Sequence, residues 1–198
     1  RVDREIVNAW VEAAERAGFP QNNDYNSGCQ DGVGYFQMTM NKSRRSSSAS
    51  AYLKPIRNRK NLSIITHTQV DKVVFDANRA VAVECRIRGV KKRITTKAEI
   101  VLAAGAIGSP QLLMLSGIGA SSELVQHGID PLVDLPGVGK NLQDHLQARP
   151  VFKCTSSTIN TEIKSIFQRL SIAAEYAITG GGPMAMAASL GTAFLKTK

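Results

Sequence analysis

The chain of 198 residues is 43% hydrophobic and 21% charged, and its formal net charge is +9. This composition is ordinary for a soluble globular protein, and no apolar run approaches the roughly 20 residues that a membrane-spanning helix needs. The basic residues are spread along the chain in short clusters, and no aromatic residues interleave with these clusters. The sequence therefore argues against nucleic-acid binding and leaves association with an acidic membrane surface open.

Cysteine usage and the two chain ends give further expectations. The three cysteines stand at wide, irregular spacing, which gives neither a disulfide framework nor a metal-ligand pattern. They favour a reducing compartment, so we expect the cytoplasm or the periphery of a membrane rather than secretion. The sequence opens inside a helical pattern at Arg1 and stops at Lys198 without a cap, and we expect it to be an internal part of a longer protein.

The N-terminal part is predicted to hold two helices. Residues 3–17 place apolar side chains at three- and four-residue steps, which indicates an amphipathic helix with Trp10 as a core anchor. A loop rich in Asn, Asp and Gly follows, and residues 35–40 are predicted to form a short strand. Serines at its start favour a second helix over residues 46–57, and Pro55 ends or bends it.

The middle of the chain is predicted to be an antiparallel meander. Its apolar residues alternate as they do in half-buried strands, and turn-forming residues separate the strands. The expected strands cover residues 62–66, 70–75, 81–87 and 90–96.

A different pattern begins at residue 100. The continuous apolar run over residues 100–104 predicts a strand covered on both faces, as in a parallel sheet. It ends on Gly105, and Ser109 with Pro110 is predicted to open a helix that Gly117 closes. A strand, a small-residue turn and a helix N-terminus make a usable anion site, because backbone N–H groups are free there. Many α/β proteins contain such turns, so this pattern alone leaves a purely structural role open.

The last part is predicted to be helical with one short strand. A helix over residues 121–127 and a strand over residues 132–135 precede a longer amphipathic helix over residues 162–177. The glycine run from Gly180 to Pro183 stops that helix. Because the run lacks the Lys and Ser/Thr of a phosphate-binding loop, we interpret it as a helix stop or hinge.

The run from Gly105 to Gly119, GAIGSPQLLMLSGIG, resembles the second signature of the glucose-methanol-choline oxidoreductases and meets every constrained position of it. Four flanking stretches are also similar to this family. They are Gly28–Leu53, which carries Gly-Val-Gly-Tyr and Arg-Arg-x-Ser, Asn61–His67, Val138–His145, and Gly181–Phe194. The resemblance covers nearly the whole chain.

The resemblance implies a mixed α/β fold. Part of a Rossmann-like FAD-binding domain, with its antiparallel β-meander, would be interleaved with part of a substrate-binding domain. Residues 27–124 would belong to the FAD-binding domain, and residues 1–26 and 125–198 to the substrate-binding domain.

The resemblance also implies the cofactor FAD and a set of contacts. Val70 would meet the adenine through its main chain. Ala104 and Gly105 would pack against the adenosine and pyrophosphate half, where only small residues leave room for the cofactor.

The implied activity is the oxidation of a primary alcohol, choline-like, aliphatic or aromatic, with hydride transfer to the flavin. The implied partners are the small-molecule alcohol, the remainder of the parent chain, and a quinone or carrier rather than oxygen as electron acceptor. The family's Gly-x-Gly-x-x-Gly fingerprint and its catalytic His have no counterpart here, so we assign no catalytic residue and expect this part alone to be inactive. The alternative is a non-catalytic FAD-binding scaffold lobe.

Two pairs of residues invite a functional interpretation. His145 follows Asp144 and looks catalytic, but neighbours in sequence rarely point together, so we interpret the pair as structural. Met184 and Met186 either line a substrate cavity or fill the core, since Met adapts to irregular apolar walls.

Overall fold

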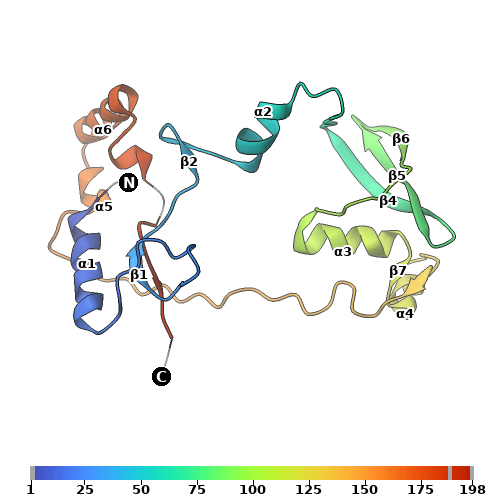
Figure 1. Ribbon diagram of the computed structural model, residues 1–198, viewed down its shortest axis with the longest axis horizontal. Coiled ribbons are helices and arrows are strands. Elements are labelled where there is room, and N and C mark those ends of the chain that lie inside the picture. The colour runs from blue at the N-terminus through green and yellow to red at the C-terminus, as the bar shows by residue number, and fades with distance from the viewer. Residues whose placement is uncertain (1–2, 187–188, 197–198) are drawn as a thin grey trace. The chain divides into compact units, whose positions relative to one another are not determined.

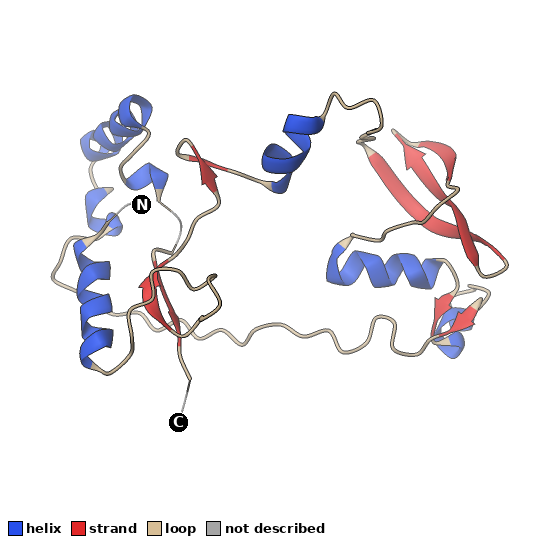
Figure 2. Ribbon diagram, in the orientation of Figure 1, coloured by secondary structure: helices blue, strands red, loops and turns tan. Residues whose placement is uncertain are grey.

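The computed structural model describes residues 3–186 and 189–196 and mixes helices with strands, most of them antiparallel (Figures 1 and 2). The expected mixed α/β character is therefore confirmed. The chain divides into two compact units: unit 1 is Arg1–Arg59 with Pro150–Lys198, and unit 2 is Lys60–Arg149. In the described part of the chain, no helix has the length and apolar character needed to cross a membrane.

Unit 1 is built on an antiparallel ladder between β1 (Gly32–Tyr35) and β9 (Gly191–Phe194). Val33 at its centre is only 1% exposed. Helix α1 (Glu5–Arg16) lies against the ladder, and a Cβ added to Gly191 would stand 3.1 Å from the ring of Trp10. The ladder joins segments from the two ends of the chain.

A hairpin follows β1 in unit 1. It consists of β2 (Met40–Asn41) paired with β3 (Arg44–Arg45), and its turn residues Lys42 and Ser43 both have positive φ. The predicted strand over residues 35–40 is wrong: pairing stops at Tyr35, and the chain forms a ladder again only at Met40. The second strand of the hairpin carries two arginines, Arg44 and Arg45.

The predicted helix after this hairpin is confirmed in part. It is a π-helical turn, η1 (Ala49–Leu53), that runs into the short helix α2 (Lys54–Ile56). Pro55 lies inside this continuous helical stretch, which ends at Ile56, as the proline predicts.

The predicted long helix over residues 162–177 is two helices, followed by a short 3-10 turn. They are α5 (Ile159–Glu162), α6 (Ile166–Thr179) and η2 (Pro183–Ala185). The break is caused by Ser165, which starts a new helix: its hydroxyl accepts from the Phe167 N–H, and its own N–H donates to the Gln168 side chain. Gly180, at φ +67°, ends α6 as expected from the glycine run.

Unit 2 contains the expected antiparallel meander. Its strands are β4 (Thr68–Asp76), β5 (Arg79–Ile87) and β6 (Val90–Thr95). Val73, Ala82 and Cys85 are 5% exposed or less and form its core. The turn residues have positive φ where the sequence predicts turns, at Ala77 and at Arg88–Gly89.

The rest of unit 2 packs beside the meander. It consists of α3 (Gly105–Leu115), β7 (Ile118–Gly119), α4 (Ser121–Gln126) and β8 (Val133–Asp134), with β7 and β8 paired in parallel. Gly117, at φ +86°, ends α3 as predicted. The predicted start of that helix is wrong, because α3 begins at Gly105, one turn before Ser109, and contains Pro110.

Two predicted strands of unit 2 are absent from the described residues. Residues 62–66 and 100–104 pair with no strand there, and Ile65 and Val101 are 52% and 77% exposed. An apolar run supplies side chains for burial, but a strand also needs a hydrogen-bonded neighbour. The prediction of a strand buried on both faces at residues 100–104 is therefore wrong for this structure.

Candidate functional site

The turn that leads into α3 is open to a ligand. Gly105 has φ +83°, and a Cβ built on it meets no atom within 4 Å. Among the described residues no side chain caps this helix start, although the Ala104 N–H donates to the Ser109 hydroxyl at 3.0 Å. Uncapped N–H groups at a helix N-terminus attract negative charge, and a glycine lets a ligand approach the main chain.

Val70 lies in β4, which is an edge strand of the meander. It pairs with Cys85 just before a register shift, and its carbonyl oxygen accepts a hydrogen bond from the Gln69 side-chain amide at 3.2 Å. An edge strand keeps unpaired main-chain groups on its outer side, and such groups can read a purine edge. The position of Val70 on an edge strand is compatible with a main-chain contact to adenine. The contact between Val70 and adenine stays a prediction.

Helix α3 and strand β4 are joined by Ser116. The Ser116 hydroxyl accepts from the Val73 N–H at 2.8 Å and donates to the Leu112 carbonyl at 2.5 Å. This contact fixes the C-terminal end of α3. Among the described residues no hydrogen bond joins the Ala104–Gly105 turn at the other end of α3 to Val70. Ser116 is the Ser of the Ser-Gly pair in the Gly105–Gly119 run, but no local pattern in the sequence predicts its bond to Val73.

Replacing Ser116 with alanine is expected to lower the free energy of unfolding of the whole protein by about 1–3 kcal/mol, because the N–H of the buried residue Val73 then has no acceptor. Ser63→Ala is the matched control, since Ser63 is exposed in a loop of the same unit and makes no recorded hydrogen bond. Urea titration of both variants measures the difference. Equal midpoints for the two variants would contradict the role given to Ser116.

The parallel pair β7–β8 is tied to α4 by charged groups. The Asp134 carboxylate accepts from the Ser121 N–H at 2.8 Å. This backbone hydrogen bond, with the Ser121 hydroxyl adding to it, holds the pKa of Asp134 below its usual value. Lys140 also bridges to Glu123 at 2.5 Å. These contacts are exposed and structural. Among the described residues, none of these groups forms a hydrogen bond with the Gly105 turn.

His145 is not oriented by its acidic neighbour. The Asp144 carboxylate accepts from the backbone N–H of His145 at 2.8 Å, and the residues around it are exposed, with Leu146 fully so. The structural interpretation of the pair fits this geometry. In the described part of the chain, no group of His, Cys, Asp or Glu could hold a metal ion.

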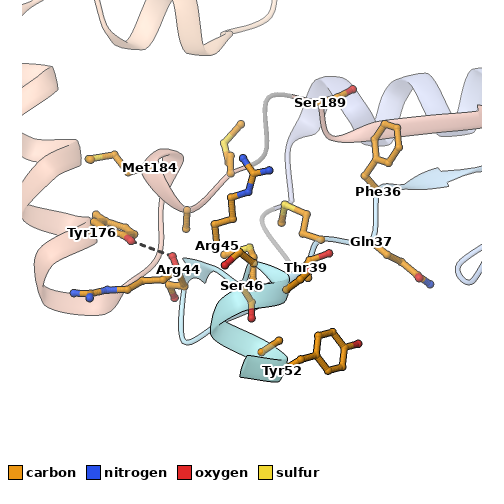
Figure 3. A pocket seen from close by; sticks show the side chains of 18 residues that line it. Phe36, Gln37, Thr39, Arg44, Arg45, Ser46, Tyr52, Tyr176, Met184 and Ser189 are labelled. Atoms are coloured by element: carbon orange, nitrogen blue, oxygen red, sulfur yellow. Dashed lines mark hydrogen bonds between the residues drawn. The ribbon is translucent and has the colours of Figure 1, made fainter. Parts of the chain in front are cut away.

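Unit 1 contains a cavity of about 1240 Å³. Its wall is formed by the β2–β3 hairpin, the start of η1, α6 and η2 (Figure 3). The hairpin is held to α6 by the Tyr176 hydroxyl, which donates to the Ser43 carbonyl at 3.0 Å. Met184 and Met186 both line this cavity, and that it receives a substrate stays a prediction.

Comparison with solved structures defines the class of protein. An FAD-dependent oxidoreductase from Chaetomium thermophilum matches 96% of the chain with a TM-score of 0.82 and 26% identity, and the chain covers 34% of it. A pyridoxine 4-oxidase from Mesorbium loti is 35% identical, with a TM-score of 0.64, over 67% of this chain and 26% of that one. The fold is that of FAD-dependent oxidoreductases.

The family follows from the sequence. Residues 2–147 match the family model described as GMC oxidoreductase, so the chain belongs to the GMC oxidoreductase family. An oxygen-dependent choline dehydrogenase of Brucella suis is 39% identical over 197 residues, which are 99% of this chain and 36% of that protein. The chain thus spans about a third of the length of this relative. FAD is the cofactor of the family, and the uncapped start of α3 at the open Gly105 turn is a surface that suits its phosphates.

Proposed function

We propose that the whole protein is an FAD-dependent oxidoreductase that oxidises primary alcohols. Membership of the GMC family over residues 2–147 is the observation that carries this proposal. The names of the relatives support it, since one is a choline dehydrogenase and another a pyridoxine oxidase. When bound, FAD accepts the hydride from the hydroxyl-bearing carbon.

We assign the cofactor contacts to unit 2. The backbone N–H groups at the start of α3 would hold phosphate oxygens, Ala104 and Gly105 would leave room for the adenosine half, and the main chain of Val70 would meet the adenine. Val70, Ala104 and Gly105 all lie in unit 2 and also within residues 27–124. We therefore keep residues 27–124 as the proposed FAD-binding part, and residues 1–26 and 125–198 as the proposed substrate-binding part.

The whole protein should show flavin absorption bands after purification. Addition of a primary alcohol in the absence of oxygen should bleach these bands, because the reduced flavin has no acceptor. Residues 1–198 alone are the control and should oxidise no alcohol, since no residue in them is assigned as the catalytic base. Lack of flavin bands in the whole protein would contradict the proposal. It would show that the protein carries no flavin and does not work as a flavoenzyme.

The protein is proposed to work in the cytoplasm or at a membrane periphery. The spread of basic residues and the net charge of +9 support contact with an acidic surface.

The electron acceptor is proposed to be a quinone or carrier. Parallel assays of quinone reduction and oxygen consumption during alcohol turnover test the acceptor. Faster turnover with oxygen, as the name of the Brucella suis relative implies for that protein, would contradict this part.

A further inference from the structure

The cavity of unit 1 has a one-sided charge. Its described lining residues include two arginines, Arg44 and Arg45, and several serine hydroxyls, and none of them is Asp or Glu. In Figure 3, Arg45 extends from the hairpin into the middle of the cavity, and Arg44 extends away from it past Tyr176. Both arginines are exposed to solvent, and Arg45 is the one that places its guanidinium in the cavity.

Arg45 has its donors available. In the described part of the chain its guanidinium forms no ion pair and no side-chain hydrogen bond. Only its backbone is engaged, in the ladder with Met40. A guanidinium offers five N–H donors in a fixed fork that matches the two oxygens of a carboxylate or a phosphate. The Ser46 hydroxyl also lines the cavity and lies 3.5 Å from the Ser50 hydroxyl.

The remaining wall is apolar and adaptable. Four methionines line it, together with the rings of Phe36, Tyr52 and Tyr176; the methionines are Met38, Met40, Met184 and Met186. The three rings stand on separate sides of the cavity (Figure 3). Phe36 packs edge-on against Tyr25 instead, with centroids 6.4 Å apart. The rings therefore do not form the aromatic cage that would hold a quaternary ammonium group.

We propose that this cavity receives the substrate, and that the substrate is an alcohol with an apolar body and an anionic group, a carboxylate or a phosphate, held by Arg45. This inference rests on the proposed function and adds the substrate class to it. A cationic alcohol would bring its charge beside the Arg45 guanidinium, and the described lining residues include no carboxylate to offset it. The similarity to choline dehydrogenases would then show that the chain belongs to the family, but it would not identify choline as the substrate.

Three benzyl alcohols that differ only in the para substituent test the proposal with the whole protein. The substituents are carboxylate, carboxamide and trimethylammonium. We expect kcat/KM for the carboxylate to exceed that for the carboxamide by about 10- to 100-fold, since a charge-assisted hydrogen bond contributes this much. The trimethylammonium compound should be the poorest substrate. Added salt should lower kcat/KM for the carboxylate compound only, because it screens the ion pair.

Three variants locate the effect. Arg45→Gln should remove the preference for the carboxylate over the carboxamide, because glutamine has neither the charge nor the fork of the guanidinium. Arg45→Lys should restore part of the preference, because it restores the charge but not the fork. Arg59→Gln is the matched control: Arg59 is an exposed arginine of the same unit outside the cavity lining, and its replacement should change nothing.

Binding of 4-methylbenzoate, measured by calorimetry, separates this inference from the proposed function. The compound has no hydroxyl, so its binding does not depend on turnover. If 4-methylbenzoate binds to the wild type and Arg45→Gln abolishes this binding, the cavity assignment is supported. This holds even if no alcohol bleaches the flavin, because a flavin that stays oxidised would count against the proposed function alone. Absence of binding, equal binding to both proteins, or a preference for the trimethylammonium alcohol would overturn the inference.

Discussion

Gly105→Ala is expected to leave the whole protein with little bound FAD, whereas Gly89→Ala keeps it. The two glycines have nearly the same φ, +83° and +84°, and a Cβ on either meets no atom within 4 Å. The backbone strain of the two substitutions should therefore match, at about 1–2 kcal/mol each. Only the Cβ at Gly105 enters the space beside the helix start that we assign to the cofactor.

The comparison isolates cofactor contact from folding. We expect the Kd of FAD to rise at least about tenfold in Gly105→Ala, which corresponds to about 1.4 kcal/mol, and to stay unchanged in Gly89→Ala. The flavin-to-protein absorbance ratio and titration of the apoprotein with FAD measure this. Equal affinities in the two variants would remove Gly105 from the cofactor site.

Gly34→Ala is expected to destabilise the ladder of unit 1 strongly. A Cβ on Gly34 would overlap the Asn22 carbonyl oxygen, which is a main-chain atom. The segment before β1 runs close beside it, with the Val33 N–H donating to the Pro20 carbonyl and the Asn22 N–H to the Val33 carbonyl. Backbone on both sides cannot move apart without loss of these bonds, so the overlap is costly.

The expected loss for Gly34→Ala is about 3 kcal/mol or more, at the upper end of overpacking effects. Gly137→Ala is the control, because its Cβ would meet nothing within 4 Å and its φ is not positive. Urea titration or thermal melting of the whole protein followed by circular dichroism should show a large shift for Gly34→Ala alone. Similar midpoints for the two variants would contradict the close approach seen in unit 1.

The elements that depend on local sequence could be predicted. The alternation of Val81, Val83 and Cys85 and the turn signals on either side define β5 and its neighbours. Gly117 marks the positive-φ turn that ends α3, as predicted. In these cases residues close in sequence contain the physical cause, namely side-chain period or backbone conformation.

The elements that depend on distant partners could not be predicted. The apolar run at residues 100–104 reads as a strand, but pairing depends on a neighbour that the run itself does not specify. The cavity likewise depends on a bond between Tyr176 and Ser43, which are 133 residues apart. In the sequence, Arg45 is one basic residue among many. Only the bond that holds the β2–β3 hairpin to α6 places Arg45 in a cavity.

The central claim is that the whole protein transfers a hydride from an alcohol carbon to FAD. Its most direct test is rapid mixing with a primary alcohol in the absence of oxygen, once with hydrogen and once with deuterium on the hydroxyl-bearing carbon. We predict that the flavin bands bleach in both cases and bleach more slowly with the deuterated alcohol. A flavin that stays oxidised in the presence of every alcohol tried would contradict the claim.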